Sequence, residues 1–111
     1  MCYHSRMMRP KTPVDYTGTG SAVTLDMILG VKQCKWFQVT GESITGVPGR
    51  VGDAGVSLDV ASPLSLGRGF PIVSSGGQFA PPIALAMEFY DLTAWYIVLT
   101  NGDTASVGCA L

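Results

Sequence analysis

The sequence is poor in charged residues. Asp, Glu, Lys and Arg make up 14% of its 111 residues, against about 25% in an ordinary soluble domain, and the net charge is −1. The seven cations are scattered, so the sequence lacks the concentrated basic face that nucleic-acid binding requires. So few charges would cover a monomer sparsely, and we expect an oligomer or lattice that buries apolar surface. The alternative is a compact monomer with a Ser, Thr and Gly surface.

Cysteine and histidine are also scarce. Cys2, Cys34 and Cys109 are an odd number without a CxxC spacing, which argues against a zinc site or a disulfide framework. We interpret them as reduced, mostly buried residues, and we expect no metal or cofactor. His4 is the only histidine and lies in an N-terminal segment without periodicity, so a Ser-His-Asp or Cys-His arrangement is disfavoured.

The carboxylates offer little for acid-base catalysis. Asp53, Asp59, Glu88 and Asp91 each lie beside Gly, Ser, Thr or Tyr in turn-like settings, where carboxylates usually cap backbone N–H groups. The segment 46-GVPGRVGD-53 lacks the ending of a phosphate-binding loop and no helix is expected after it. We therefore predict no catalytic residue; a small hydrolase that uses Asp and Cys is the rival hypothesis.

No hydrophobic run approaches the roughly 18 to 20 residues that span a bilayer, so no membrane segment is predicted. Near the N-terminus, 10-PKTP-13 and the polar 16-YTGTG-20 leave no room for the apolar core of a signal peptide. We expect a protein that is made in the cytoplasm and used without export.

The sequence is rich in Gly and Pro, with 14 and 7 residues, and 47% of its residues are hydrophobic. This combination is typical of β-strands joined by tight turns, and the length fits one core. We predict an all-β fold, an antiparallel β-sandwich or jelly-roll-like domain over residues 21–111. The expected strands lie at residues 21–29, 34–40, within 50–64, at 70–73 and at the edge segment 78–79. Residues 83–92 have some helix propensity, but we favour a turn at 88–92.

The C-terminal segment carries a clear local pattern. Residues 94–100 (AWYIVLT) are aromatic and β-branched, and residues 103–110 alternate between small apolar and polar side chains. Asn101 and Gly102 between them match a type I′ turn, so the pattern predicts an antiparallel hairpin. The first strand is apolar on both faces, which indicates that both faces are covered.

Residues 1–20 are predicted to be an extended N-terminal arm. They lack hydrophobic periodicity, Pro10 and Pro13 favour extended backbone, and Gly18 and Gly20 supply a hinge. The arm is expected to order against a neighbouring protein, with a disordered start as the alternative. A chain that begins at Ser21 is therefore expected to fold normally and to bind its partner less tightly.

Five motifs in order resemble small virion proteins of tailed bacteriophages: 35-KWFQVTGESITG-46, 50-RVGD-53, 68-RGFPI-72, 78-QFAPPI-83 and 88-EFYDLTAWYIVLTNGDTASV-107. Proteins of that group show a KW strand, an RVGD turn, an RGIPL strand, a PP edge and a final hairpin in the same order. The sequence departs from this pattern at residues 47–49, at residues 58–63 and in its long arm.

The resemblance implies a non-enzymatic head-decoration (cement) or head-fibre protein that binds the capsid surface of the virion. It implies a homotrimer in contact with the major capsid protein, since cement proteins commonly occupy local three-fold axes. The alternative is a tail or baseplate module that binds host glycan through Trp36, Tyr90, Trp95 or Tyr96, although such aromatics more often lie in a core or an interface. The residues expected at an oligomer or capsid interface are Tyr3, Arg6, Met7, Met8, Arg9, Tyr16, Trp36, Trp95 and Tyr96.

Overall fold

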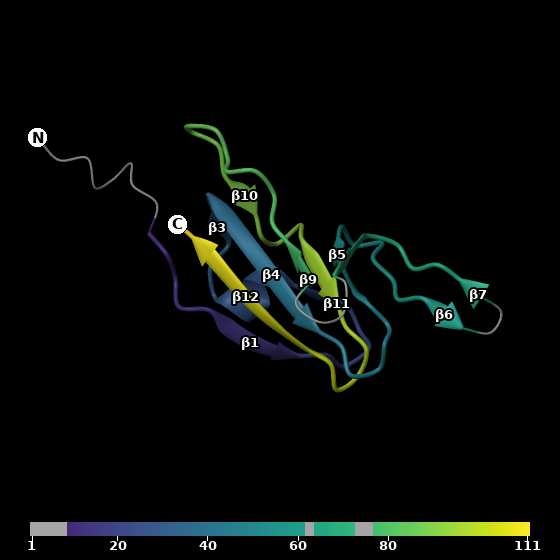
Figure 1. Cartoon of the computed structure of the whole chain (residues 1–111). Coiled ribbons are helices and arrows are strands. Elements are labelled where there is room, and N and C mark those ends of the chain that lie inside the picture. The colour runs from purple at the N-terminus through teal and green to yellow at the C-terminus, as the bar shows by residue number, and fades with distance from the viewer. Residues whose placement is uncertain (1–8, 62–63, 73–76) are drawn as a thin grey trace, which may run out of the picture.

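Two four-stranded antiparallel sheets form the body of the protein (Figure 1). The computed structural model describes residues 9–61, 64–72 and 77–111. The first sheet, here called the β12 sheet, has the order β1 (Val14–Thr17), β12 (Thr104–Ala110), β4 (Trp36–Glu42) and β9 (Gly77–Phe79). The second, the β11 sheet, has the order β2 (Val23–Thr24), β11 (Tyr96–Val98), β5 (Gly49–Gly52) and β8 (Phe70–Ile72). The prediction of an all-β sandwich is confirmed.

Two small pairs and one short helix complete the described elements. β3 (Gln33–Cys34) pairs with β10 (Tyr90–Asp91), which lies where a turn was predicted. β6 (Val60–Ala61) and β7 (Leu64–Ser65) form a hairpin that projects from the body (Figure 1). The predicted strands at 34–40, 70–73 and 78–79 correspond to β3 with β4, to β8 and to the edge strand β9.

The predicted strand at residues 21–29 is wrong over most of its length. Only β2 is extended, and α1 (Leu25–Leu29) follows it and ends at Gly30, whose φ is 76°. A continuous strand would direct Leu25, Met27 and Leu29 to one face. One helical turn instead buries Leu25 and Leu29 and leaves Met27 75% exposed.

The core lies between the two sheets. Alternate residues of β4 and β12 point inward, so the polar residues between them face outward. Both sheets, α1 and the segments beside them contribute buried side chains, which include Leu25, Leu29, Phe37, Val39, Val51, Ile72, Leu92, Ile97, Leu99 and Val107.

The predicted C-terminal hairpin is also wrong. β11 pairs with β2 and β5, whereas β12 pairs with β1 and β4, so the two strands belong to different sheets. The turn between them is closed by the N–H of Asp103, which donates to the carbonyl of Thr100 at 3.0 Å. Within it only Gly102 has a positive φ, 92°, which is the pattern of a type II turn; a type I′ turn needs positive φ at Asn101 as well. Ile97 and Val98, which point to opposite faces of β11, are 0% and 3% exposed, so both faces are covered within one chain.

The predicted arm differs from the structure from Arg9 onward. β1 pairs with β12 over its whole length, and the backbones of Arg9 and Leu111 exchange two hydrogen bonds. Pro10 opposes Ala110 and Val14 opposes Val107. Between these pairs the N-terminal segment has three residues and β12 has two, so the extra residue forms a β-bulge in the N-terminal segment. Residues 1–8 lie outside the described residues. The sequence did not predict β1 because its alternation of inward and outward side chains covers only four residues.

Replacing Gly102 by Val should lower the free energy of unfolding by about 1–3 kcal/mol, because a β-branched residue resists a φ of 92°. A Cβ at this position would meet no atom within 4 Å, so the effect isolates backbone conformation. Urea denaturation measures it, with Asn101→Val as the matched control at the neighbouring position. If the two variants are equally stable, the assigned turn geometry is incorrect.

Candidate functional site

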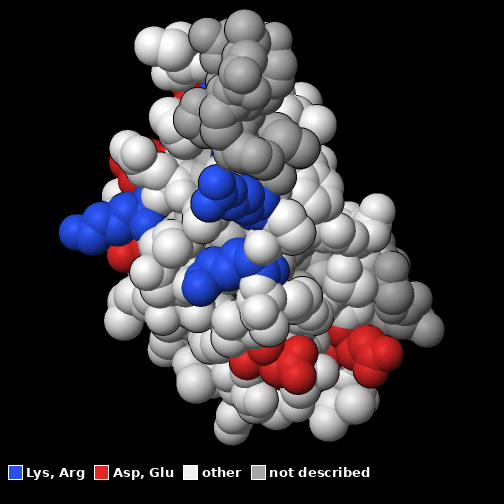
Figure 2. Space-filling model, turned by 90° about the vertical axis from the view of Figure 1, so that its left-hand side faces the viewer, with Lys and Arg blue, Asp and Glu red and all other residues white. Residues whose placement is uncertain are grey.

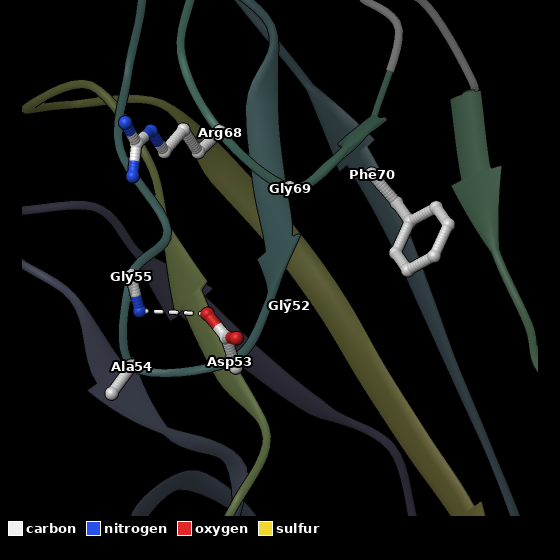
Figure 3. Close-up of a pocket in the computed structure, with 7 residues that line it drawn as sticks. All are labelled: Gly52, Asp53, Ala54, Gly55, Arg68, Gly69 and Phe70. Atoms are coloured by element: carbon white, nitrogen blue, oxygen red, sulfur yellow. Dashed lines mark hydrogen bonds between the residues drawn. The ribbon is translucent and has the colours of Figure 1, made fainter.

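A cleft of about 550 Å³ opens between residues 52–55 and residues 68–70 (Figure 3). The first segment follows β5 and the second leads into β8, and these strands are paired, so both segments leave the sheet at the same end. A second hollow of about 260 Å³ shares Asp53 and Phe70 and reaches Trp95. We call the two together the Asp53–Phe70 cleft.

Glycines shape the floor of this cleft. Gly69 has a φ of 114°, and a Cβ there would lie 3.0 Å from the carbonyl oxygen of Val51. A Cβ on Gly52 would lie 3.4 Å from the Cα of Gly69. A side chain at Gly69 would therefore be strained, and backbone lines this part of the floor.

Asp53 projects its carboxylate at the cleft (Figure 3). Its Oδ1 accepts a hydrogen bond from the N–H of Gly55 at 2.8 Å, and its carbonyl accepts one from Val56 at 3.1 Å. The predicted turn role of this carboxylate is thus confirmed. Among the described residues, Oδ2 has no hydrogen-bond partner, so one oxygen is free to meet a ligand.

A hydrogen-bond network beside the cleft holds the backbone of Arg68 in place. The backbones of Ser57 and Arg68 exchange two hydrogen bonds of 3.0 Å. Arg50 donates to the carbonyl of Gly69 at 3.0 Å and to Asp59 Oδ1 at 2.8 Å. The N–H of Gly67 lowers the pKa of Asp59 most, partial burial opposes it, and Arg50 lowers it further. The carboxylate of Asp59 therefore stays ionised and fixes the base of the β6–β7 hairpin.

A series of aromatic rings in contact links the cleft to the core. Phe70 is 55% exposed, and its ring stacks on Phe79 with centroids 4.9 Å apart and an interplanar angle of 27°. Phe79 lies 5.6 Å from Trp95, and Trp95 lies 5.1 Å from the buried Phe37. Phe70 is therefore a supported platform with an accessible surface.

The cleft combines a carboxylate, a guanidinium and an exposed ring. In the described part of the chain the one ion pair is Arg50–Asp59, so neither Asp53 nor Arg68 has an ionic partner there. No group of three His, Cys, Asp or Glu residues suited to a metal occurs in residues 9–61, 64–72 and 77–111. The arrangement suits a polar, uncharged ligand with an apolar face.

The buried thiols are unsuited to nucleophilic attack. Burial, with a contribution from the neighbouring Cys109, raises the pKa of Cys34 to about 11, and burial also raises the pKa of Cys109. Both thiols are protonated at neutral pH, whereas the thiolate is the nucleophile. His4, whose pairing with a thiol the sequence disfavours, lies outside the described residues.

A second surface feature is an exposed loop at residues 83–89, which we call the apolar loop. It projects from the body before β10 (Figure 1). Its exposed large apolar residues are Ile83, Leu85, Met87 and Phe89, with exposed fractions of 58%, 70%, 93% and 52%.

Lys35 fixes the shape of the apolar loop. Its ammonium donates to the carbonyls of Leu85 and Glu88 and lies 4.3 Å from the ring centroid of Phe89. Met87 has a φ of 72° in a turn closed by a 2.9 Å hydrogen bond from the N–H of Glu88 to Leu85. Positive φ at a non-glycine residue is strained, so the fold maintains this exposed tip at a local cost.

The aromatic residues expected at an interface do not gather on one surface. Tyr16 and Trp95 are partly buried and pack against the core. Trp36 lies on the outer face of β4, on the opposite side from the core residue Phe37. Tyr96 is half-buried in β11. Tyr90 and Trp95 lie together, with ring centroids 6.2 Å apart, and the alternative of a glycan site formed by Trp and Tyr stays a hypothesis.

The charged and Met residues of the expected interface are only partly described. Arg9 is exposed beside the C-terminus, and Tyr3, Arg6, Met7 and Met8 lie outside the described residues. Figure 2 shows the face that lies at the left of Figure 1. This face is mostly uncharged and carries only a few charged side chains.

Sequence reasoning missed that Asp53, Arg68 and Phe70 line one cleft, into which Arg68 and Phe70 extend in opposite directions from Gly69 (Figure 3). Two motifs, RVGD and RGFPI, contain them, and an exposed Phe next to an edge-strand Pro is the signal that could have indicated a platform.

No described helix is long and apolar enough to cross a membrane. Comparisons with protein-family models, curated proteins and solved structures find no match to this chain.

Proposed function

We propose that this chain is a non-enzymatic structural protein of a tailed-phage virion, which binds the capsid surface and stabilises it as a cement protein. The observation that carries the proposal is the apolar loop, where four large side chains are exposed on a backbone fixed by Lys35. Leaving them in water is unfavourable, and burial against a protein shell would stabilise each by up to about 1.5–3 kcal/mol. The ordered motifs that resemble phage virion proteins supply the identity of the shell.

The partners we propose are the major capsid protein and further copies of this chain, arranged as a homotrimer on the virion surface. The low charge content supports association, and the mostly uncharged face in Figure 2 is consistent with it. The trimer itself follows from the resemblance. Sedimentation equilibrium at micromolar concentration tests it, and a stable monomer would contradict it.

Replacing Met87 by Asp should weaken binding to empty capsid shells of the encoding phage by at least about tenfold, because an exposed apolar contact becomes a charge that must be desolvated. Co-sedimentation with shells measures the affinity. Val60→Asp is the matched control, since Val60 is 51% exposed on the distant β6–β7 hairpin. Equal losses in both variants would contradict a role of the apolar loop, and absence of the protein from purified virions would contradict the function.

A further inference from the structure

We propose that the Asp53–Phe70 cleft binds a neutral saccharide, an activity that goes beyond capsid attachment and does not depend on it. The volume of the main hollow, about 550 Å³, lies within the roughly 300–1,000 Å³ usual for small-molecule sites. The second hollow extends it toward Trp95, so an oligosaccharide has room for more than one ring.

The exposed ring of Phe70 is the first element of the site. A sugar ring presents C–H groups on its less polar face, and these pack well on an aromatic face. Phe79 supports Phe70 from within, and Phe79 in turn contacts Trp95. Because the rings are already packed, little side-chain entropy is lost when a ligand binds.

Asp53 and Arg68 supply the second element. The free Oδ2 of Asp53 accepts hydrogen bonds from hydroxyl groups, and the guanidinium of Arg68 donates to hydroxyl or ring oxygens. An anionic ligand would be repelled by Asp53, and a cationic ligand would be repelled by Arg68. A neutral polyol satisfies both groups, which is why we infer a neutral saccharide rather than a phosphate or an amine.

Trp95 provides a built-in reporter. The chain contains two tryptophans, so Trp36→Phe leaves Trp95, which lines the second hollow, as the single fluorophore. A glycan array followed by fluorescence titration with soluble glucose, galactose, mannose, rhamnose and N-acetylglucosamine oligosaccharides is the experiment. We expect saturable shifts of Trp95 emission with at least one neutral oligosaccharide at millimolar concentration or below.

Variants then locate the site. Phe70→Ala and Asp53→Asn should each weaken saccharide binding by at least about tenfold, which corresponds to about 1.4 kcal/mol. Phe89→Ala is the matched control, since Phe89 is 52% exposed in the apolar loop and should leave saccharide affinity unchanged. Circular dichroism and the melting temperature confirm that each variant is folded.

Three results would overturn the proposal: no saturation by any neutral oligosaccharide up to about 10 mM, undiminished binding in Asp53→Asn, or equal loss in Phe70→Ala and Phe89→Ala. Phe70→Ala should leave co-sedimentation with shells unchanged, whereas Met87→Asp should leave saccharide binding unchanged. Loss of saccharide binding would therefore contradict the saccharide site alone, and loss of co-sedimentation with shells would contradict the proposed function alone.

Discussion

A chain that begins at Ser21 should be strongly destabilised relative to a chain that begins at Arg9, which keeps β1. The first truncation removes β1, which pairs with β12 from Val14 opposite Val107 to Thr17 opposite Thr104. It also removes Tyr16, which packs against the core. A chain that begins at Arg9 keeps β1, the Pro10–Ala110 bridge and the two hydrogen bonds between Arg9 and Leu111.

The expected loss for the chain from Ser21 is at least about 3 kcal/mol, since two half-buried side chains each contribute roughly 1–2 kcal/mol and the backbone pairing is lost as well. That is a large part of the about 5–15 kcal/mol that stabilises a typical domain. β12 would also become an exposed edge strand, which promotes aggregation. Circular dichroism during heating and size-exclusion chromatography measure both effects.

Point variants in the full chain test the contribution of β1 to stability even if the truncated chain does not express. Tyr16→Ala and Val14→Ala should lower the melting temperature, because both side chains point inward. Asp15→Ala is the matched control, because Asp15 alternates with them and is exposed. The prediction is contradicted if all three variants have the melting temperature of the natural chain and the chain from Ser21 folds normally. Residues 9–20 would then be an arm that does not stabilise the domain.

The errors of sequence reasoning at both ends of the chain share one physical cause. Hydrophobic alternation and turn residues reveal local conformation, and they located β4, β8 and β9 well. Pairing is a non-local property: Asn101-Gly102 marks a turn, but the φ of Asn101 decides whether the strands pair or separate into two sheets. Likewise Val14 and Tyr16 form a strand only because β12 offers them a partner.

The candidate site was predictable only in pieces. Asp53 was correctly expected to accept a backbone N–H, as the bond from Gly55 shows. Its proximity to Arg68 and Phe70 depends on the pairing of β5 with β8, which joins residues as far apart in the sequence as Gly49 and Ile72. The strained turn at Met87 has no sequence signal, since Gly or Asn is the usual residue at a positive φ.

Replacing Asp103 by Asn should lower the free energy of unfolding at pH 7 by about 2–4 kcal/mol, because the carboxylate is a buried acceptor for several donors. Asp103 is 2% exposed. Its Oδ2 accepts hydrogen bonds of 2.9 Å from the hydroxyls of Ser43 and Thr45, and its Oδ1 accepts one of 3.0 Å from the N–H of Ile44. The NH2 group of the introduced asparagine would replace one of the two carboxylate oxygens and would face hydrogen-bond donors. The hydrogen bonds to that oxygen would therefore be lost.

The loss should depend on pH in a defined direction. Burial opposes ionisation of Asp103, but the hydrogen bonds from Ser43, Thr45 and the backbone outweigh it, and its pKa in the folded protein lies below the usual value. An Asp in the unfolded chain has a pKa of about 3.9. The stabilisation is therefore complete above that pH and is lost as the pH falls through the lower folded pKa. The gap between the natural chain and Asp103→Asn should narrow accordingly on acidification.

Urea denaturation at about pH 7 and at successively lower pH values down to about 2 measures this gap. Asp53→Asn is the matched control, since it removes the same charge at an exposed turn and should change stability little at either end of the range. Ser43→Ala should reproduce part of the loss, because it removes one hydroxyl donor to Oδ2 while leaving the charge in place. A gap that stays constant across this pH range would show that ionised Asp103 does not stabilise the junction between the 43–45 segment and β12.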